Sequence, residues 1–265
     1  MQQSNGYIVG FTVGMTVICA VLLAGVSEYL KPEHKRQEDI DIKTNILSAY
    51  MDVPAGADIQ GLYDQYIDGI VVNYQGEVVE KNSEGNPVSA ANIQPRKEYK
   101  KKDIEDKLFP VYRFKSEVNT GSYDAYIVPV YGNGLWDEIW GYVAIGPDYN
   151  TIEGTSFDHK GETPGLGARI TTDEFETRFK GKQIFDGESL KSVTVLKGEG
   201  NDITSEQEYK VDGLSGATMT TNGVNSMLES YFKHYQPYLS KSRNTITSTG
   251  SVTSNVNVDD LLNHQ

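Results

Sequence analysis

The longest apolar run of the chain lies at its N-terminus. From Tyr7 to Val26 nearly every residue is apolar, and no side chain carries a charge before Glu28. Twenty residues of helix rise about 30 Å, which matches the hydrocarbon core of a bilayer. The pattern predicts a transmembrane helix within residues 1–30. A cleaved signal peptide is the alternative, but the run has no basic segment before it and a poor cleavage-site match near Ala24.

A charged segment and then β-rich texture follow this span. Residues 31–50 are charged with isoleucines interspersed, which predicts a connecting helix. From about Asp52 the chain breaks into short runs rich in β-branched and aromatic residues. We expect strands at 69–74 and 77–79, forming a hairpin, and at 112–115, 125–130, 140–145 and 189–196.

Two helices are expected among these strands. Thr171 and Glu174 have the spacing of a capping box for a short helix that carries Phe175 and Phe179. A second helix is expected to start near Thr221. Its apolar positions recur at helical spacing and predict core packing; they are Val224, Met227, Leu228, Tyr231, Phe232 and Tyr235. The sequence predicts an α+β class with a folded domain over residues 51–243 and a flexible polar tail over 244–265.

Composition excludes several kinds of site. The chain has 37 acidic and 24 basic residues and a net charge of −13, so general nucleic-acid binding is not expected. With one cysteine and four histidines, the chain cannot by itself build a four-thiolate iron–sulfur centre or a structural zinc site. We expect no metal site and no catalytic acid or base.

Small residues and hydroxyls gather in the segment from Asp212 to Thr220, which leads into the last predicted helix. The start of a helix offers unpaired N–H groups and a positive dipole end, as a phosphate group requires. An ordinary N-cap made by Thr220 or Thr221 would give the same pattern. A nucleophilic role for Ser215 is weaker, because the flanking-glycine elbow of hydrolases is missing.

A second candidate segment is Gly161-Glu162-Thr163-Pro164-Gly165-Leu166-Gly167. Three glycines and a proline so close together predict a tight surface turn, and most such turns have no further role. A turn of this kind would also let the backbone approach a flat ligand, with Leu166 against a ring face and Glu162 or Thr163 making polar contacts.

Both segments resemble the motifs of one family. Residues 215–220, Ser-Gly-Ala-Thr-Met-Thr, resemble the flavinylation motif of the FMN-binding domain family, and residues 162–167 resemble its second motif. Within that family the chain is most similar to the C subunits of the sodium-translocating NADH:quinone oxidoreductases. The G subunits of Rnf complexes share both motifs but usually lack the Asn222-Gly223-Val224 continuation. The resemblance covers most of residues 6–240.

The resemblance implies a covalent cofactor. Thr220 would carry FMN as a phosphoester, installed from FAD by a flavin transferase that recognises the motif and Asp212. The chain would relay single electrons within a six-subunit membrane complex coupled to sodium export. It would do so on the periplasmic side of the cell inner membrane. The other cofactor-binding residues expected are Ser215, Gly216, Ala217, Thr218, Glu162, Thr163, Gly165, Leu166, Lys197 and Trp136.

Some of these roles have simpler alternatives. Lys197 would add a positive contact to the phosphate, or it is a solvated surface lysine. Trp136 would shield the flavin, or it is a core aromatic. Basic residues follow the apolar run at Lys31, Lys35 and Arg36, so the positive-inside rule alone would place the domain in the cytoplasm. An Rnf-type flavin subunit, a membrane-tethered domain that binds a ligand non-covalently and an ectodomain with a purely structural role remain as alternative functions.

Overall fold

The structure is a computed structural model that describes residues 5–82, 84–116 and 122–253, with side chains as far as residue 246. The chain divides into two compact units, Met1–Lys43 and Thr44–Gln265. The first unit holds most of helix α1. The second holds the end of that helix and the remaining helices and strands.

Helix α1 runs without a break from Asn5 to Ser48 and contains Pro32. The expected span and the expected connecting helix are therefore one continuous element. Its apolar residues from Tyr7 to Val26 are exposed. Within the described part of the chain it is the helix that is long and apolar enough to cross a membrane. An exposed apolar helix of this length fits a membrane anchor.

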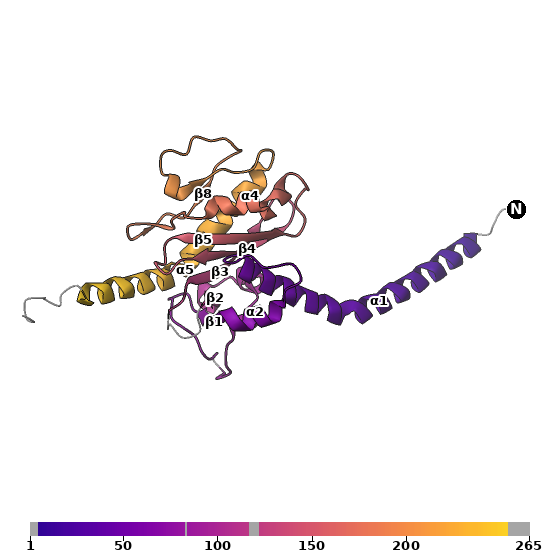
Figure 1. Ribbon diagram of the computed structural model, residues 1–265. Coiled ribbons are helices and arrows are strands. Elements are labelled where there is room, and N and C mark those ends of the chain that lie inside the picture. Colours follow the sequence, from indigo (N-terminus) through magenta and orange to yellow (C-terminus); the bar gives the residue numbers. More distant parts are fainter. Residues whose placement is uncertain (1–4, 83, 117–121, 254–265) are drawn as a thin grey trace, which may run out of the picture. The chain divides into compact units, whose positions relative to one another are not determined.

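A five-stranded antiparallel sheet forms the centre of the second unit (Figure 1). Each strand pairs with the next one along the chain, as in an antiparallel meander, although the connection from β1 to β2 is long and spans residues 73–108. The strands are β1 (Ile67–Val72), β2 (Phe109–Phe114), β3 (Ala125–Asn133), β4 (Glu138–Ile145) and β5 (Ile152–His159). The α+β class with mostly antiparallel strands is confirmed, although β5 was not expected.

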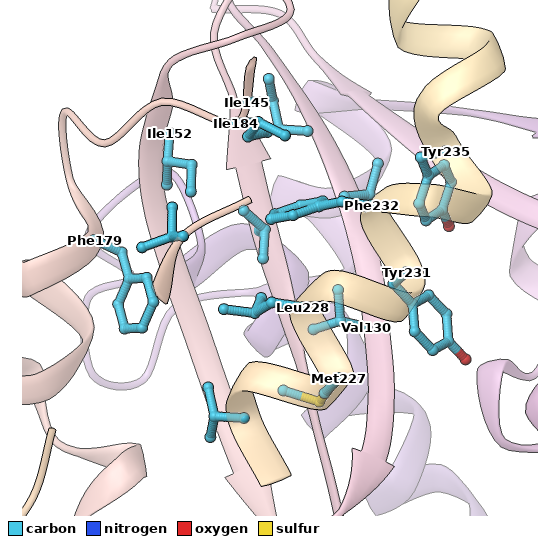
Figure 2. Close-up of a cluster of buried hydrophobic side chains, with 14 of the residues drawn as sticks. Val130, Ile145, Ile152, Phe179, Ile184, Met227, Leu228, Tyr231, Phe232 and Tyr235 are labelled. Carbon is cyan, nitrogen blue, oxygen red and sulfur yellow. The ribbon is translucent and has the colours of Figure 1, made fainter. Parts of the chain in front are cut away.

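Both faces of this sheet are buried against apolar clusters, and side chains alternate along each strand, so successive residues enter opposite clusters. Val128 and Val130 of β3 face a cluster completed by helix α5 (Thr218–Thr253). Figure 2 shows Leu228 and Phe232 of α5 in that cluster. Ile127 lies in a second cluster on the opposite face. That cluster includes Ile46, Leu47 and Ala49, and helix α2 (Ile59–Tyr66) packs against it.

The apolar stripe of α5 is buried as predicted, but the bounds of the helix differ from those expected. It begins at Thr218, three residues before the expected start, and Thr221 N–H donates to the Ala217 carbonyl. It continues to Thr253, so residues 244–253 are helical where a loose tail was expected. Extending an established helix costs little per residue, and no proline follows Pro237. Residues 254–265 of the expected tail lie outside the described residues.

Short elements complete the second unit, and two of them correct the expectations. The strand expected at 189–196 is split because Ser192 has a φ of 64°, which interrupts an extended chain. The capping box is wrong: the Thr171 and Thr172 hydroxyls donate to carbonyls behind them, those of Ala168 and Arg169. Phe175 and Phe179 are nevertheless fully buried, because they pack against Phe157 of β5.

The expected hairpin near residue 75 has a short second arm. Val72 pairs with Val78 by a single bridge, and the turn is closed by the Gly76 N–H donating to the Asn73 carbonyl. The longer partner of β1 is β2. The remaining elements are α3 (Pro95–Lys100), α4 (Asp173–Glu176), β6 (Phe185–Asp186), β7 (Ser189–Leu190), β8 (Thr194–Val195) and β9 (Lys210–Val211), with 3-10 turns at Ala90–Asn92, Ile104–Asp106, Gly167–Thr171, Thr177–Phe179 and Gln207–Tyr209.

Candidate functional site

The two motifs meet at one end of the sheet. Antiparallel pairing places the end of β3, the start of β4 and the end of β5 together, since Asn133 pairs with Glu138 and Ile139 with His159. The first turns of α5 pack against the same end. A Cβ on Gly223 would lie 2.3 Å from the Asn133 carbonyl oxygen, so only glycine permits this approach. The turn after β5 thereby reaches the start of α5.

A buried hydrogen bond joins the two motifs. The Thr220 hydroxyl donates to Oε2 of Glu162 at 2.5 Å, across 58 positions of sequence. Thr220 is 1% exposed and Glu162 is 4% exposed. The second carboxylate oxygen of Glu162 accepts from the Trp136 backbone N–H at 2.9 Å. Two donors therefore hold one carboxylate from two different segments, which is what burial of a charged group requires.

Two glycines make room for that carboxylate. A Cβ on Gly134 would lie 2.5 Å from Oε1 of Glu162. A Cβ on Gly167 would lie 2.5 Å from both Oε2 of Glu162 and the Thr220 hydroxyl oxygen. Glycine at 167 thus serves close packing over the hydroxyl, because its φ lies outside the left-handed region that favours glycine.

The predicted tight turn covers Thr220. The Leu166 and Ala168 N–H groups both donate to the Thr163 carbonyl, and Gly165 has a φ of 76°, a conformation that favours glycine. The Thr163 hydroxyl accepts from the Trp136 indole N–H at 3.1 Å. Trp136 is tied in this way to both residues 162 and 163.

Exposed apolar side chains surround this turn. Trp136 is 69% exposed and Met219 is 58% exposed; Leu135 and Leu166 are exposed as well. The alternative that Trp136 is a core aromatic is therefore wrong. Leu166 lies against the motif loop, since a Cβ on Gly216 would lie 2.9 Å from its Cδ2. Large apolar groups gathered at a surface are typical of a place where a ligand or a partner binds.

Asp212 holds the loop that precedes α5. Its carboxylate accepts from the backbone N–H groups of Gly200 and Asn201 and from the Asn201 side chain, at 2.7–3.1 Å. Desolvation raises the pKa of Asp212, and these hydrogen bonds outweigh it, so the pKa is lowered overall. In this structure the residue stabilises a loop–loop contact.

An ion-pair network that the sequence did not indicate fixes the same loop. Arg178 donates to the carbonyls of Asp212 and Gly213, at 3.2 and 2.6 Å, and pairs with Glu199. Glu199 also pairs with Arg169 and accepts from the Ser215 N–H at 3.4 Å. These contacts, first those with Arg169 and Arg178, lower the pKa of Glu199 to about 2. No local signal in the sequence joins these residues, because they come from separate turns.

Other predicted residues lie at the edge of this arrangement. Lys197 is exposed, and no contact among the described residues joins its ammonium group to the motif. Within the same part of the chain no contact joins Ser215 to a histidine, so the structure offers no support for a hydrolase site there. Ala217 is buried and Thr218 is half-buried at the helix start. No group of potential metal-binding side chains is found among the described residues.

The residues present fit a phosphate ester at the start of α5. The Thr221 hydroxyl is buried beside Thr220 and has no hydrogen-bond partner in the described structure. The first-turn N–H groups lack acceptors within the helix, and the dipole there favours negative charge. A surface cavity of about 320 Å³ lies elsewhere, where β7 and β8 meet α5 near Ser192 and Asn225. Thr220 itself is covered, so a bulky group on it requires the 163–167 turn to move.

Comparisons with known proteins point to one family. Residues 134–233 match the FMN-binding domain family, and this range contains both motifs. The C subunit of the Na(+)-translocating NADH-quinone reductase of Haemophilus ducreyi is 32% identical over 87% of this chain and 91% of its own length. The corresponding protein of Neisseria meningitidis serogroup A is 35% identical over 86% of this chain and 90% of its own length.

Solved structures agree with the sequence comparisons. The crystal structure of the C subunit of this reductase from Parabacteroides distasonis is 33% identical and superposes with a TM-score of 0.67, over 79% of this chain and 96% of that one. The NqrC structure from Shewanella oneidensis is 26% identical, with a TM-score of 0.65, over 79% of this chain and 99% of that one.

Proposed function

Because the chain belongs to the family of C subunits of the Na(+)-translocating NADH-quinone reductases, we propose that it carries FMN as a phosphoester on Thr220 and relays single electrons within that complex. The chain is one subunit of the reductase and has an FMN-binding domain. The proposal adds to this the covalent attachment at Thr220 and the transfer of single electrons.

The contact between Thr220 and Glu162 is the observation that carries the proposal. It singles out one hydroxyl of the motif, lies at the positive end of α5 and brings together the two segments that resemble the family's motifs. Thr218 lies two residues away, but no hydrogen bond among the described residues engages its hydroxyl. A phosphoester on Thr220 would place its charge at the helix N-terminus, a contribution of about 0.3–1 kcal/mol or more where the group is partly buried.

The protein's own residues would position the flavin. FMN supplies the one-electron chemistry, and the fold sets where the cofactor lies and how far water reaches it. Trp136, Leu166 and Met219 offer apolar surface beside Thr220 for a flat ring. The Arg178 and Glu199 contacts keep the motif loop rigid on its other side. Movement of the 163–167 turn would uncover the hydroxyl.

We also propose the membrane location and orientation of the domain. Helix α1 would anchor the chain in the cell inner membrane, with the flavin domain on the periplasmic side and the other five subunits as partners. Basic residues after the span favour the opposite side when charge alone is counted. Contacts of α1 with partner helices would set the orientation, since a single span has few determinants of its own.

Intact mass and peptide mapping test the attachment. The full chain, co-expressed with its flavin transferase, is expected to gain the mass of FMN less water on the peptide that contains Thr220. Thr220→Val should abolish the gain, and Thr218→Val should leave most of it. Flavin that is released by acid, or mass retained in the Thr220 variant, would refute the proposal. Assembly of the complex without flavin would favour a purely structural role.

A further inference from the structure

We propose that Glu162 takes the proton from the Thr220 hydroxyl when the flavin phosphoester forms. The inference rests on the function proposed above and concerns the residue that makes this threonine reactive. A threonine hydroxyl is a weak nucleophile and needs a neighbouring base to accept its proton. The structure holds such a group against the hydroxyl before any transferase arrives.

The geometry assigns Glu162 this role. Its Oε2 lies 2.5 Å from the Thr220 hydroxyl oxygen, within the reach of a general base. Oε1 accepts from the Trp136 N–H, so both oxygens act as acceptors, as in an ionised carboxylate. The absence of a side chain at Gly134 and Gly167 permits this arrangement.

Other candidate bases are turned elsewhere. His159 uses its Nδ1 to accept from the Glu162 backbone N–H at 3.3 Å. Glu199 faces the Ser215 N–H and two arginines. Of the described titratable side chains, Glu162 is the one hydrogen-bonded to the Thr220 hydroxyl. The same contact explains why Thr220 would be modified in preference to Thr218.

The step balances with FAD as the donor. The Thr220 oxygen forms a bond to the phosphorus on the riboflavin side of FAD, and the bond from that phosphorus to the bridging oxygen breaks. AMP leaves with the bridging oxygen and its electron pair. The hydroxyl proton passes to Oε2 of Glu162. No oxidation or reduction occurs.

Charge and hydrogen bonding both favour this destination for the proton. An esterified Thr220 has no proton to donate. An ionised Glu162 would then place its acceptor oxygen against another acceptor oxygen in a buried site, which is unfavourable. If Glu162 takes the proton, it becomes the donor to the ester or phosphate oxygens. The phosphodiester brings one negative charge with the flavin phosphate and the protonated carboxyl has lost one, so the net charge of the site stays the same.

The test measures flavin transfer to the full chain in detergent, with purified transferase and FAD, followed by intact mass. Glu162→Gln keeps an acceptor for the Trp136 N–H and offers an amide donor to the Thr220 oxygen, so the variant is expected to fold. Its kcat for flavin incorporation should fall by about 10²-fold or more, the usual contribution of a general base. The KM for the chain should hold, because Glu162 is buried and does not form the surface that the transferase binds. Glu162→Asp should recover part of the rate.

Two controls make the outcome specific. Glu176→Gln removes another carboxylate that accepts a backbone N–H, that of Phe157, and should load at the wild-type rate. In the loaded wild type, difference infrared spectra should show a new protonated-carboxyl band that slowly loaded Glu162→Gln lacks. A kcat for folded Glu162→Gln within about threefold of wild type, far below a general base's contribution, would overturn the inference. Wild type left unmodified at Thr220 would instead refute the proposed function.

Discussion

Glu162 can be buried because two of its neighbours are glycines and two others donate hydrogen bonds to it. Residues 134 and 167 lack the Cβ that would occupy the carboxylate's place, and donors from residues 136 and 220 satisfy both of its oxygens. A glycine of this kind has an ordinary φ but tolerates alanine poorly, because the added Cβ would collide with a neighbouring side chain that is held in place.

Gly167→Ala is therefore expected to disturb the site directly. Its Cβ would lie 2.5 Å from both the Glu162 and Thr220 oxygens. We expect a loss of about 1–3 kcal/mol in the free energy of unfolding and a fall in flavin incorporation, measured by urea unfolding and intact mass. Gly161→Ala is the matched control, since its Cβ would meet only Asp137 Cβ, at an ordinary 3.6 Å. Equal behaviour of the two variants would contradict the packing argument.

Glu176 gives a prediction on pH. Burial raises its pKa to about 7; Asp173 and Asp158 add to the rise, and the Phe157 N–H opposes it. The unfolded carboxyl ionises near its usual pKa of 4.5. The folded state therefore holds the proton longer, and stability falls from about pH 4.5 to about pH 7 and then levels off.

Glu176→Gln should remove that dependence. The variant is expected to be more stable than wild type by about 1–3 kcal/mol at pH 8 and to match it near pH 4. Thermal unfolding across this range checks the prediction. If wild-type stability rose between pH 5 and pH 7 and the Glu176→Gln variant lacked that rise, the pKa of Glu176 would be lowered on folding instead of raised.

At the scale of elements, the loop before α5 is held by side chains from a distant turn. Arg178 lies 34 and 35 positions before the two carbonyls that it binds. The arginine's planar fork reaches carbonyl and carboxylate together, which lysine's single ammonium cannot do. The helix start depends on this anchor as well as on its own residues.

Removal of the anchor should loosen the motif. Arg178→Ala is expected to cost about 1–3 kcal/mol in unfolding free energy and to speed amide exchange in residues 212–217, because two carbonyls and Glu199 lose a donor. Lys233→Ala, which breaks the exposed pair with Glu229 on α5, serves as control and should cost at most about 0.5 kcal/mol. Unchanged exchange in the Arg178 variant would show that the loop is held by its backbone alone.

At the scale of the whole molecule, the division after Lys43 separates an exposed apolar helix from a domain with its own core. Ile46 and Leu47 belong to that core even though they lie on the same helix as the apolar run. The domain therefore begins before α1 ends.

Deletion of residues 1–43 should thus release a folded domain. We expect it to stay in solution without detergent and to unfold at nearly the same urea concentration as the full chain. A longer deletion, through residue 50, also removes Ile46, Leu47 and Ala49 and should cost about 2–5 kcal/mol, as loss of large core side chains does. If the two deletions were equally stable, the core would not include the end of α1.

Local patterns in the sequence predicted much of this protein. The run from Tyr7 to Val26 predicted a transmembrane helix, and the structure has an exposed apolar helix there; the period of the residues from Val224 to Tyr235 predicted the buried face of α5. Short runs rich in β-branched and aromatic residues predicted β2, β3 and β4, because such side chains favour extended chain packed within a sheet. β5 was missed, since Gly154, Thr155 and Ser156 give it a weak apolar signal.

The sequence by itself determined the two candidate segments for cofactor binding, because their glycines, hydroxyls and carboxylates are local features of the chain. Only the tertiary structure decided that Glu162 bonds Thr220, that Arg178 holds Gly213, and that Lys197 stays apart from the motif. The physical reason is that strand register and the crossing of α5 set which distant turns meet. Neither the strand register nor the crossing of α5 can be inferred from the residues next to a given position in the chain.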